Sequence, residues 1–347
     1  MRPSGMLRSA IAAALFLGAA SARADEINLI FATGSPAGSE VSEEFFRPFA
    51  EKLNAAGKGV LHVDFREGSA ISDPAKAYDR ITSDAIQIGF MLPNLVAGKF
   101  PRTQVVTLPY IAGDISEYSS RALWRVYEHG PLAKEYDQVR VLAISTISQA
   151  SIHMLKALPS RMALAGNKIM VTSKTAADVI TRLGGAPISL PPFQVYEALM
   201  RHTVDGTVTG WPSFQPFKLI EVTTYHIDAP IGSSIAVVFM AKAKYNSLLE
   251  AARKIIDANS GEQASREFGR MWDIVAERAR QLIKKTPGQR LVAPTDAEAD
   301  EIRKKTAPVV DDWLAATPDG KETLDQFNAA LAAVELTHER DPSRTGK

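Results

Sequence analysis

Residues 166–211 read GNKIMVTSKTAADVITRLGGAPISLPPFQVYEALMRHTVDGTVTGW. Apolar runs in this stretch predict three short buried strands, at 167–171, 187–190 and 204–208. Apolar residues at helical spacing predict two helices, at 176–183 and 195–200. Because strands that alternate with helices form a sheet covered by helices, this stretch predicts an α/β fold.

The chain on both sides of this stretch extends the pattern. Further strands are predicted at 27–31, 60–65, 86–91, 139–145 and 235–240. Beyond Lys242 the pattern is almost entirely helical, over 248–259, 263–285, 295–315 and 321–335. Two groups of α/β units followed by helices predict two lobes with mixed sheets, a hinge, and C-terminal helices that pack on both lobes. Ligands in such folds bind beyond the carboxyl ends of strands, so the site is expected in those loops.

The N-terminus has the features of an export signal. Arg2 and Arg8 supply positive charge, residues 10–20 are apolar, and Ala22 and Ala24 are small residues at the cleavage positions. A membrane anchor is the alternative, but this apolar stretch falls well short of the ~20 residues that span a bilayer. We therefore expect residues 1–24 to be a cleaved signal peptide and the mature chain to lie outside the inner membrane.

Composition and motifs argue against several classes of function. The 347-residue chain carries a formal net charge of +1, so it lacks the field that recruits nucleic acid. It has no cysteine, which removes thiol catalysis and thiolate metal sites. The six histidines are scattered, and neither a nucleophile elbow nor a Walker loop is present. We expect no metal, no cofactor and no catalytic residue.

Four motifs within residues 166–211 carry a family resemblance. G-N-K-I-M in the first strand is followed by L-G-G-A-P, Y-E-A-L and V-D-G, at 183–187, 196–199 and 204–206. In this order the motifs resemble the central signature of the substrate-binding proteins of tripartite ATP-independent periplasmic (TRAP) transporters. Further segments are similar to other elements of that family, at 68–70, 87–89, 108–110 and 243–245, so the resemblance covers most of residues 26–285.

The resemblance implies a two-lobed periplasmic binding protein with a type II-like architecture. We expect the first lobe to comprise residues 25–147 and 236–276. The second lobe is expected to comprise residues 148–235 and 277–335, including the hinge-spanning and C-terminal helices. Residues 336–347 are polar and charged, and we expect a disordered tail there.

In function, the resemblance implies a periplasmic subunit that is not an enzyme, captures a small organic solute and delivers it to a membrane permease. We expect it to be a monomer that is not embedded in the membrane, although some relatives dimerise through a long C-terminal helix. Within the same class, the binding protein of an ATP-driven transporter or of a sensor kinase stays an alternative. From another class, the alternative is a periplasmic hydrolase or lyase on a two-lobed scaffold.

Met170 marks a departure from the family pattern. Most family members hold a carboxylate with an arginine at this position, whereas methionine carries no charge and donates no hydrogen bond. The resemblance therefore implies either a different ligand or a different cation. Lys174, at the entry to the next helix, is the nearest candidate cation, and Arg182 and Arg201 are less favoured. The competing interpretation of Lys174 is an exposed lysine at a helix start.

The remaining predicted ligand contacts are mostly aromatic. Those in the second lobe are Phe193, Tyr196, Thr209 and Trp211, of which Phe193 matches a position that often contacts ligand in the family. Those expected on the opposing wall or near the hinge are Met91, Tyr110 and Gln149. Aromatic rings would suit an apolar or aromatic ligand body, but packing in a domain core is the alternative for each of them.

Overall fold

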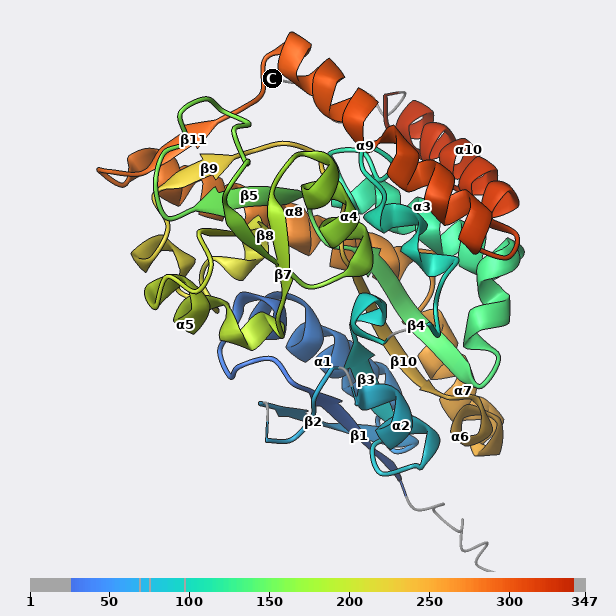
Figure 1. Ribbon diagram of the computed structural model, residues 1–347. Coiled ribbons are helices and arrows are strands. Elements are labelled where there is room, and N and C mark those ends of the chain that lie inside the picture. Colours follow the sequence, from blue (N-terminus) through green and yellow to red (C-terminus); the bar gives the residue numbers. More distant parts are fainter. Residues whose placement is uncertain (1–25, 69, 75, 97, 340–347) are drawn as a thin grey trace, which may run out of the picture.

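The computed structural model describes residues 26–339 except 69, 75 and 97. The predicted signal peptide and the last eight residues of the predicted tail lie outside the described residues. Two sheets, one in each lobe, organise the rest of the chain (Figure 1). The predicted two-lobed α/β architecture is therefore confirmed.

The first sheet has five strands in the order β2-β1-β3-β10-β4. Their bounds are Ile27–Thr33 for β1, Leu61–Glu67 for β2, Ile88–Met91 for β3, Val139–Thr146 for β4 and Ile235–Ala241 for β10. β1 runs parallel to β2 and β3, whereas β10 is antiparallel to both β3 and β4. β4 is consequently parallel to β1, so the carboxyl ends of β1, β2, β3 and β4 all lie at one edge of the sheet.

The second sheet has six strands in the order β11-β9-β5-β8-β6-β7. Their bounds are Ala150–Met154 for β5, Lys168–Val171 for β6, Ala186–Ser189 for β7, Gly206–Gly210 for β8, Tyr225–Ile227 for β9 and Arg290–Val292 for β11. β6, β7 and β8 are mutually parallel, and β5 is antiparallel to β8. Because Ala150 at the start of β5 pairs with Gly210 at the end of β8, the carboxyl ends of these three strands lie where the chain enters the lobe.

Helices cover both faces of the first sheet. The bounds are Ser42–Phe46 for η1, Arg47–Gly57 for α1, Ala77–Thr82 for α2, Ser116–His129 for α3, Lys242–Ser247 for α6 and Glu250–Ala258 for α7. On one face, η1, α1 and α8 (Glu262–Lys285) bury an aromatic cluster in which the rings of Phe45 and Phe268 stack 3.9 Å apart. Burying each such ring contributes about 1.5–3 kcal/mol, so this cluster fixes the position of α1 against the sheet.

The second lobe has shorter helices, and one long helix joins it to the first. α4 spans Lys174–Arg182 and α5 spans Val195–Met200. α8, Glu262–Lys285, packs against α3 and β4 of the first lobe and also against β11 of the second. Two further crossings connect the lobes, one between β4 and β5 and one between β9 and β10. α8 thus contacts both lobes, and its role as a hinge-spanning helix stays a prediction.

The two C-terminal helices contact different lobes. α9, Asp296–Ala316, packs on α4 of the second lobe, and α10, Gly320–Glu339, packs on α3 of the first (Figure 1). The expectation that these helices pack on both lobes is confirmed. However, α10 lies with the first lobe rather than with the second, to which residues 277–335 were assigned. It also continues through residues 336–339, where a disordered tail was expected.

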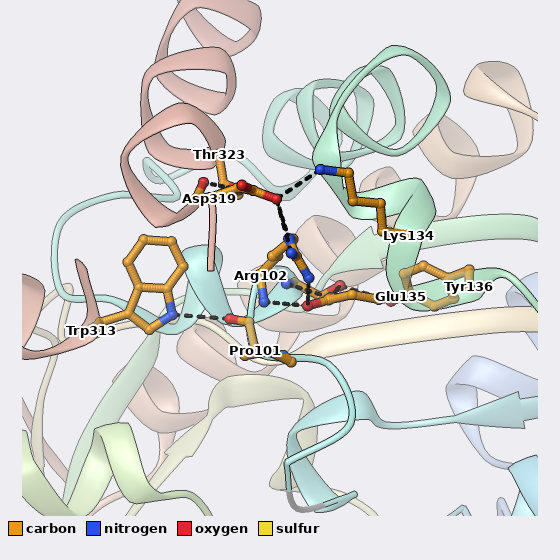
Figure 2. Close-up of polar contacts among 9 residues, drawn as sticks. Pro101, Arg102, Lys134, Glu135, Tyr136, Trp313, Asp319 and Thr323 are labelled. Carbon is orange, nitrogen blue, oxygen red and sulfur yellow. Dashed lines mark hydrogen bonds and ion pairs between the residues drawn. The ribbon is translucent and has the colours of Figure 1, made fainter. Parts of the chain in front are cut away.

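A polar cluster holds the α9–α10 corner against the first lobe (Figure 2). The Arg102 guanidinium binds the Asp319 carboxylate at 2.9 Å, and Lys134 binds the same oxygen at 2.8 Å. The Trp313 indole donates to the Pro101 carbonyl at 3.0 Å. The α9–α10 corner is therefore bound to the first lobe at two points, through Asp319 on Arg102 and through Trp313 on Pro101.

Candidate functional site

The two sheets direct the carboxyl ends of their parallel strands towards each other. In the first lobe these ends lie at the edge where β4 leaves for the second lobe, since β4 is parallel to β1 and β3. In the second lobe the ends of β6, β7 and β8 lie at the edge where β5 begins. Ligands of open α/β sheets bind beyond such edges. The space between the lobes is therefore the candidate site.

Contacts near the hinge bring the two edges close together. A Cβ added at Gly210, at the end of β8, would lie 3.2 Å from the Ser148 carbonyl oxygen and 3.3 Å from its hydroxyl. Thr107 in the first lobe donates a 3.0 Å hydrogen bond to the Thr175 hydroxyl at the start of α4. These contacts join the two lobes beside the β4–β5 crossing.

Buried polar atoms without partners gather at the first lobe's edge. Within the described part of the chain, six buried side-chain atoms lack a hydrogen-bond partner, on Thr33, Glu67, Ser72, Asn94, Arg140 and Ser148. All but Arg140 lie at or shortly after the carboxyl ends of β1, β2, β3 and β4. Leaving a buried polar group unpaired costs about 1–3 kcal/mol, so such groups are rare in folded proteins. A hydrogen bond to a solute or to water would satisfy these atoms.

Phe193 is the aromatic side chain that the second lobe leaves open at its edge. It follows β7 within a short 3-10 turn, Pro192–Gln194, and is 73% exposed. Exposed phenylalanine is unfavourable in water, and its ring lies after the carboxyl end of a strand that faces the first lobe. Of the predicted aromatic contacts, Phe193 has the geometry most suited to an incoming ligand.

Met170 and Trp211 are buried within the second lobe. Met170 is 1% exposed and Trp211 is fully buried, in one cluster with Leu199, Phe214 and Ala276. The Trp211 indole donates to Asp228 at 2.9 Å. The Thr209 hydroxyl bonds that of Ser213 at 2.7 Å. The structure therefore gives Met170 and Trp211 packing roles, and their predicted ligand contacts stay predictions.

Lys174 is highly exposed. Its side chain is 86% exposed and pairs with Asp178, four residues on, at 2.5 Å. The helix it begins is capped by the Ser173 hydroxyl, which accepts from the Ala176 amide. Arg182 pairs with Asp312 and Arg201 with Glu197, both on the surface. None of these cations is held in place by burial, so a role in replacing the family's arginine stays a prediction.

The other predicted contacts are engaged with the protein itself. The Gln149 amide donates to the Gly113 carbonyl at 2.6 Å and accepts from the Gly232 amide at 3.2 Å, so it ties the two hinge strands together. Tyr110 has a positive φ of 64° and donates to the Ala299 carbonyl at 3.4 Å. Tyr196 donates to Glu221 at 2.9 Å, which raises the pKa of the tyrosine. Met91 is fully buried in the first lobe.

A charged network supports the β5–β9 side of the second lobe. Asp228 accepts from Arg280 and Ser151, both at 2.8 Å, as well as from Trp211. Burial alone would raise the pKa of Asp228, but these donors outweigh it and lower that pKa. Arg280 lies on α8, so this network anchors the hinge-spanning helix to the second sheet.

Two buried histidines lie beside this network. The Nδ1 atoms of His153 and His226 are 3.0 Å apart, and His153 Nε2 lies 3.1 Å from the Thr209 carbonyl. Burial, followed by the effect of the neighbouring His226, holds the pKa of His153 well below its usual range. Burial also lowers the pKa of His226. Both rings therefore resist protonation in the folded protein.

The sequence interpretation did not select the residues at the first lobe's edge. Thr33, Glu67, Ser72, Asn94 and Ser148 are polar residues at or just after predicted strands, which is a usable signal. The resemblance drew attention to the second lobe instead.

In the described residues, no helix has both the length and the apolar character that crossing a bilayer requires.

Comparisons with known proteins agree with this geometry. Residues 31–316 match the family model of bacterial extracellular solute-binding proteins, family 7 (DctP). The outer membrane transporter protein TsaT of Comamonas testosteroni is 26% identical over 318 residues, which cover 88% of this chain and 91% of TsaT.

Two solved structures are similar over nearly their whole length. A TRAP solute-binding protein from Rhodoferax ferrireducens, in complex with copurified benzoate, is 26% identical with a TM-score of 0.82, covering 90% of this chain and 99% of that one. A TRAP periplasmic solute-binding protein from Bordetella bronchiseptica, with bound mandelate, is 25% identical with a TM-score of 0.80, covering 89% and 99%. With two lobes, facing strand ends and a family match over most of its length, the chain belongs to the family 7 extracellular solute-binding proteins, the solute-binding proteins of TRAP transporters.

Proposed function

We propose that this chain captures an aromatic carboxylate between its two lobes in the periplasm and delivers it, chemically unchanged, to a TRAP membrane permease. The observation that supports this most directly is the group of unpartnered buried polar atoms at or after the carboxyl ends of the first lobe's strands, together with the exposed Phe193 ring after a strand of the second lobe. One side of the cleft offers hydrogen bonds and the other offers an aromatic surface. That combination fits a small amphipathic solute.

The aromatic character of the ligand is supported by two relatives. The Rhodoferax ferrireducens protein carries benzoate and the Bordetella bronchiseptica protein carries mandelate. Both ligands have one ring and one carboxylate. A ring stacked on Phe193 would remove apolar surface of both partners from water, which stabilises the complex.

The absence of catalysis is part of the proposal. The buried titratable groups of the second lobe, Asp228 and the His153–His226 pair, are hydrogen-bonded to partners on α8 and within the second sheet. An enzyme on this scaffold would need an acid or base within reach of the solute. We propose a monomeric binding protein whose closure, rather than any reaction, is the event the permease detects.

The proposal is tested by titrating the purified mature chain with benzoate and mandelate in a calorimeter, with succinate and glucose as comparison solutes. We expect one site per chain, with benzoate or mandelate bound at least tenfold more tightly than either comparison solute. Incubated ligand, analysed by liquid chromatography, should be recovered unchanged. Turnover of the ligand would contradict the proposal, and so would tighter binding of succinate or glucose.

A further inference from the structure

We propose that Thr33 and Glu67 form a polar subsite in the first lobe that accepts a hydrogen bond from the solute, so that the preferred ligand is an aromatic acid bearing a hydroxyl group. This inference rests on the proposed function. Beyond the proposed function, it states that the end of the solute facing the first lobe carries a hydroxyl group.

The strand register places the two side chains next to each other. β1 and β2 are parallel, and Thr33 pairs with Glu67 at the last position of both strands. Two residues earlier, Phe31 pairs with Phe65, and their rings meet at a centroid distance of 5.2 Å on the α1 side of the sheet. Since side chains alternate along a strand, Thr33 and Glu67 lie on that same side. They form the last pair of this face, at the edge towards the second lobe.

Each of the two residues has a buried atom that is not satisfied. Thr33 is fully buried, and its Oγ1 atom has no hydrogen-bond partner. The Oε2 atom of Glu67 is also buried and also lacks a hydrogen-bond partner. The Thr33 carbonyl is already used by the Gly68 amide at 3.1 Å. Two unpaired oxygens on side chains from paired strand positions are costly to the folded protein, and a bound donor group removes part of that cost.

Arg47 defines the chemistry of the subsite. Its guanidinium donates to Glu67 Oε1 at 3.0 Å and also pairs with Glu43 at 3.2 Å. The Glu67 side chain is 14% exposed, so it is held in place by α1 on one side. A carboxylate paired in this way only accepts hydrogen bonds, which leaves Oε2 as an acceptor without a donor.

The turn after β1 keeps this corner narrow. A Cβ added at Gly34 would approach the Ser72 carbonyl oxygen to 2.6 Å and the Pro74 ring to 2.7 Å, so the two loops that follow β1 and β2 are in contact. Only glycine allows this approach. The loops thus hold Thr33 and Glu67 at a fixed place on the edge.

The charge of Glu67 selects among possible solutes. A solute carboxylate placed here would face a second carboxylate and be repelled, whereas a hydroxyl would donate to Oε2. The Thr33 hydroxyl can accept from or donate to the same group. The solute's own carboxylate must therefore lie towards the second lobe, with its hydroxyl towards the first.

Calorimetric titration with 3- and 4-hydroxybenzoate, benzoate and benzene-1,3-dicarboxylate tests the subsite. We expect the wild-type chain to bind the better hydroxybenzoate at least tenfold more tightly than benzoate, because a hydrogen bond to a charged acceptor distinguishes them. In Glu67→Gln this preference should fall below about twofold, and binding of the dicarboxylate should increase. Glutamine keeps an oxygen for Arg47 and presents an NH₂ group in place of Oε2.

Thr33→Val provides a second variant that keeps the side-chain shape, and it should reduce the preference by about threefold or more. Glu43→Gln is the matched control, because Glu43 pairs with the same arginine but lies on the surface, and it should leave the preference unchanged. Equal binding of benzoate and both hydroxybenzoates by the wild-type chain would overturn the subsite while leaving the proposed function intact. Failure of every aromatic acid to bind would instead reject the proposed function.

Discussion

Phe193 is the residue on which the aromatic part of the proposed ligand depends. We expect Phe193→Ala to weaken benzoate binding at least tenfold, because the benzoate ring loses the aromatic surface on which it is proposed to stack. The melting temperature should stay within about 1–2 °C, since a ring that is 73% exposed contributes little to the core. Calorimetric titration and thermal unfolding measure the two effects.

Met200→Ala is the control for that experiment. Met200 is 47% exposed and lies at the end of α5, the helix that follows the Phe193 turn. Its removal should leave benzoate affinity unchanged. If Phe193→Ala bound benzoate as well as the wild-type chain did, the aromatic wall would have to lie elsewhere.

The buried histidines give the stability of the protein a defined pH dependence. The pKa values of His153 and His226 are lowered in the folded state, so as pH falls below about 6.5 the unfolded chain binds protons that the folded chain does not. The free energy of unfolding should therefore decrease from pH 7.5 to pH 5.5, by up to about 1.4 kcal/mol per pH unit for each histidine below its unfolded pKa. Urea unfolding at the two pH values measures the decrease.

His153→Gln tests the assignment of that effect. A glutamine does not titrate, so the variant should lose less stability than the wild-type chain does over the same pH interval, even if it is less stable at pH 7.5. A wild-type chain with equal stability at both pH values would show that these rings can accept protons while folded.

At the residue level, the sequence singled out Phe193 as an aromatic after a strand and Met170 as an uncharged residue where the resemblance implies arginine, and the ligand contacts of both stay predictions. It could not reveal that Met170 packs against Leu199 and Ala276, because those contacts join β6, α5 and α8. Nor could it pair Thr33 with Glu67, since the register of two strands 27 residues or more apart is fixed only when the sheet forms.

Among the elements, α9 and α10 link the lobes through contacts of unequal strength. On the first lobe, the Arg102 side chain is 14% exposed and binds Asp319, at the start of α10, at 2.9 Å. On the second lobe, α9 pairs Glu298 with Arg161 and Asp312 with Arg182 at exposed positions. Exposed pairs contribute about 0–1 kcal/mol, so we expect α9 and α10 to move with the first lobe when the lobes rearrange.

The cluster in Figure 2 provides the corresponding test. Arg102→Ala should destabilise the protein by about 1–3 kcal/mol, because it removes the charged partner of Glu135, whose side chain is 2% exposed, and it also removes the contact to Asp319. Lys134→Ala removes the other cation on Asp319, but Lys134 is 62% exposed and the loss should stay below about 0.5 kcal/mol. Urea unfolding of both variants measures the difference, and equal effects would show that the cluster does not anchor the corner.

Elements with strong periodicity were predictable and short edge elements were not. The strands at 27–31 and 235–240 and the helix at 263–285 were predicted because their apolar residues follow one period over enough length. β9 and β11 were missed. Each has three residues, and the two strands pair with each other across about 60 residues of chain while β9 also pairs with β5, so no local pattern marks them.

For the whole molecule, the two-lobed arrangement followed from the order of α/β units, whereas the position of α10 did not. Helical periodicity gives the buried face of a helix but not its neighbour. α10 belongs with the first lobe because Asp319 at its start binds Arg102 and Lys134. The proposed function depends on the lobes as units that move towards each other around a solute.

Closure can be measured directly, because the chain contains no cysteine and two introduced thiols would be the only ones. Spin labels at Glu51→Cys on α1 and Arg201→Cys after α5 place one exposed probe on each lobe. The inter-label distance distribution, recorded by double electron–electron resonance with and without saturating benzoate, should shift to a shorter and narrower range when ligand is bound. An unchanged distribution at a benzoate concentration that saturates the calorimetric titration would contradict capture between closing lobes.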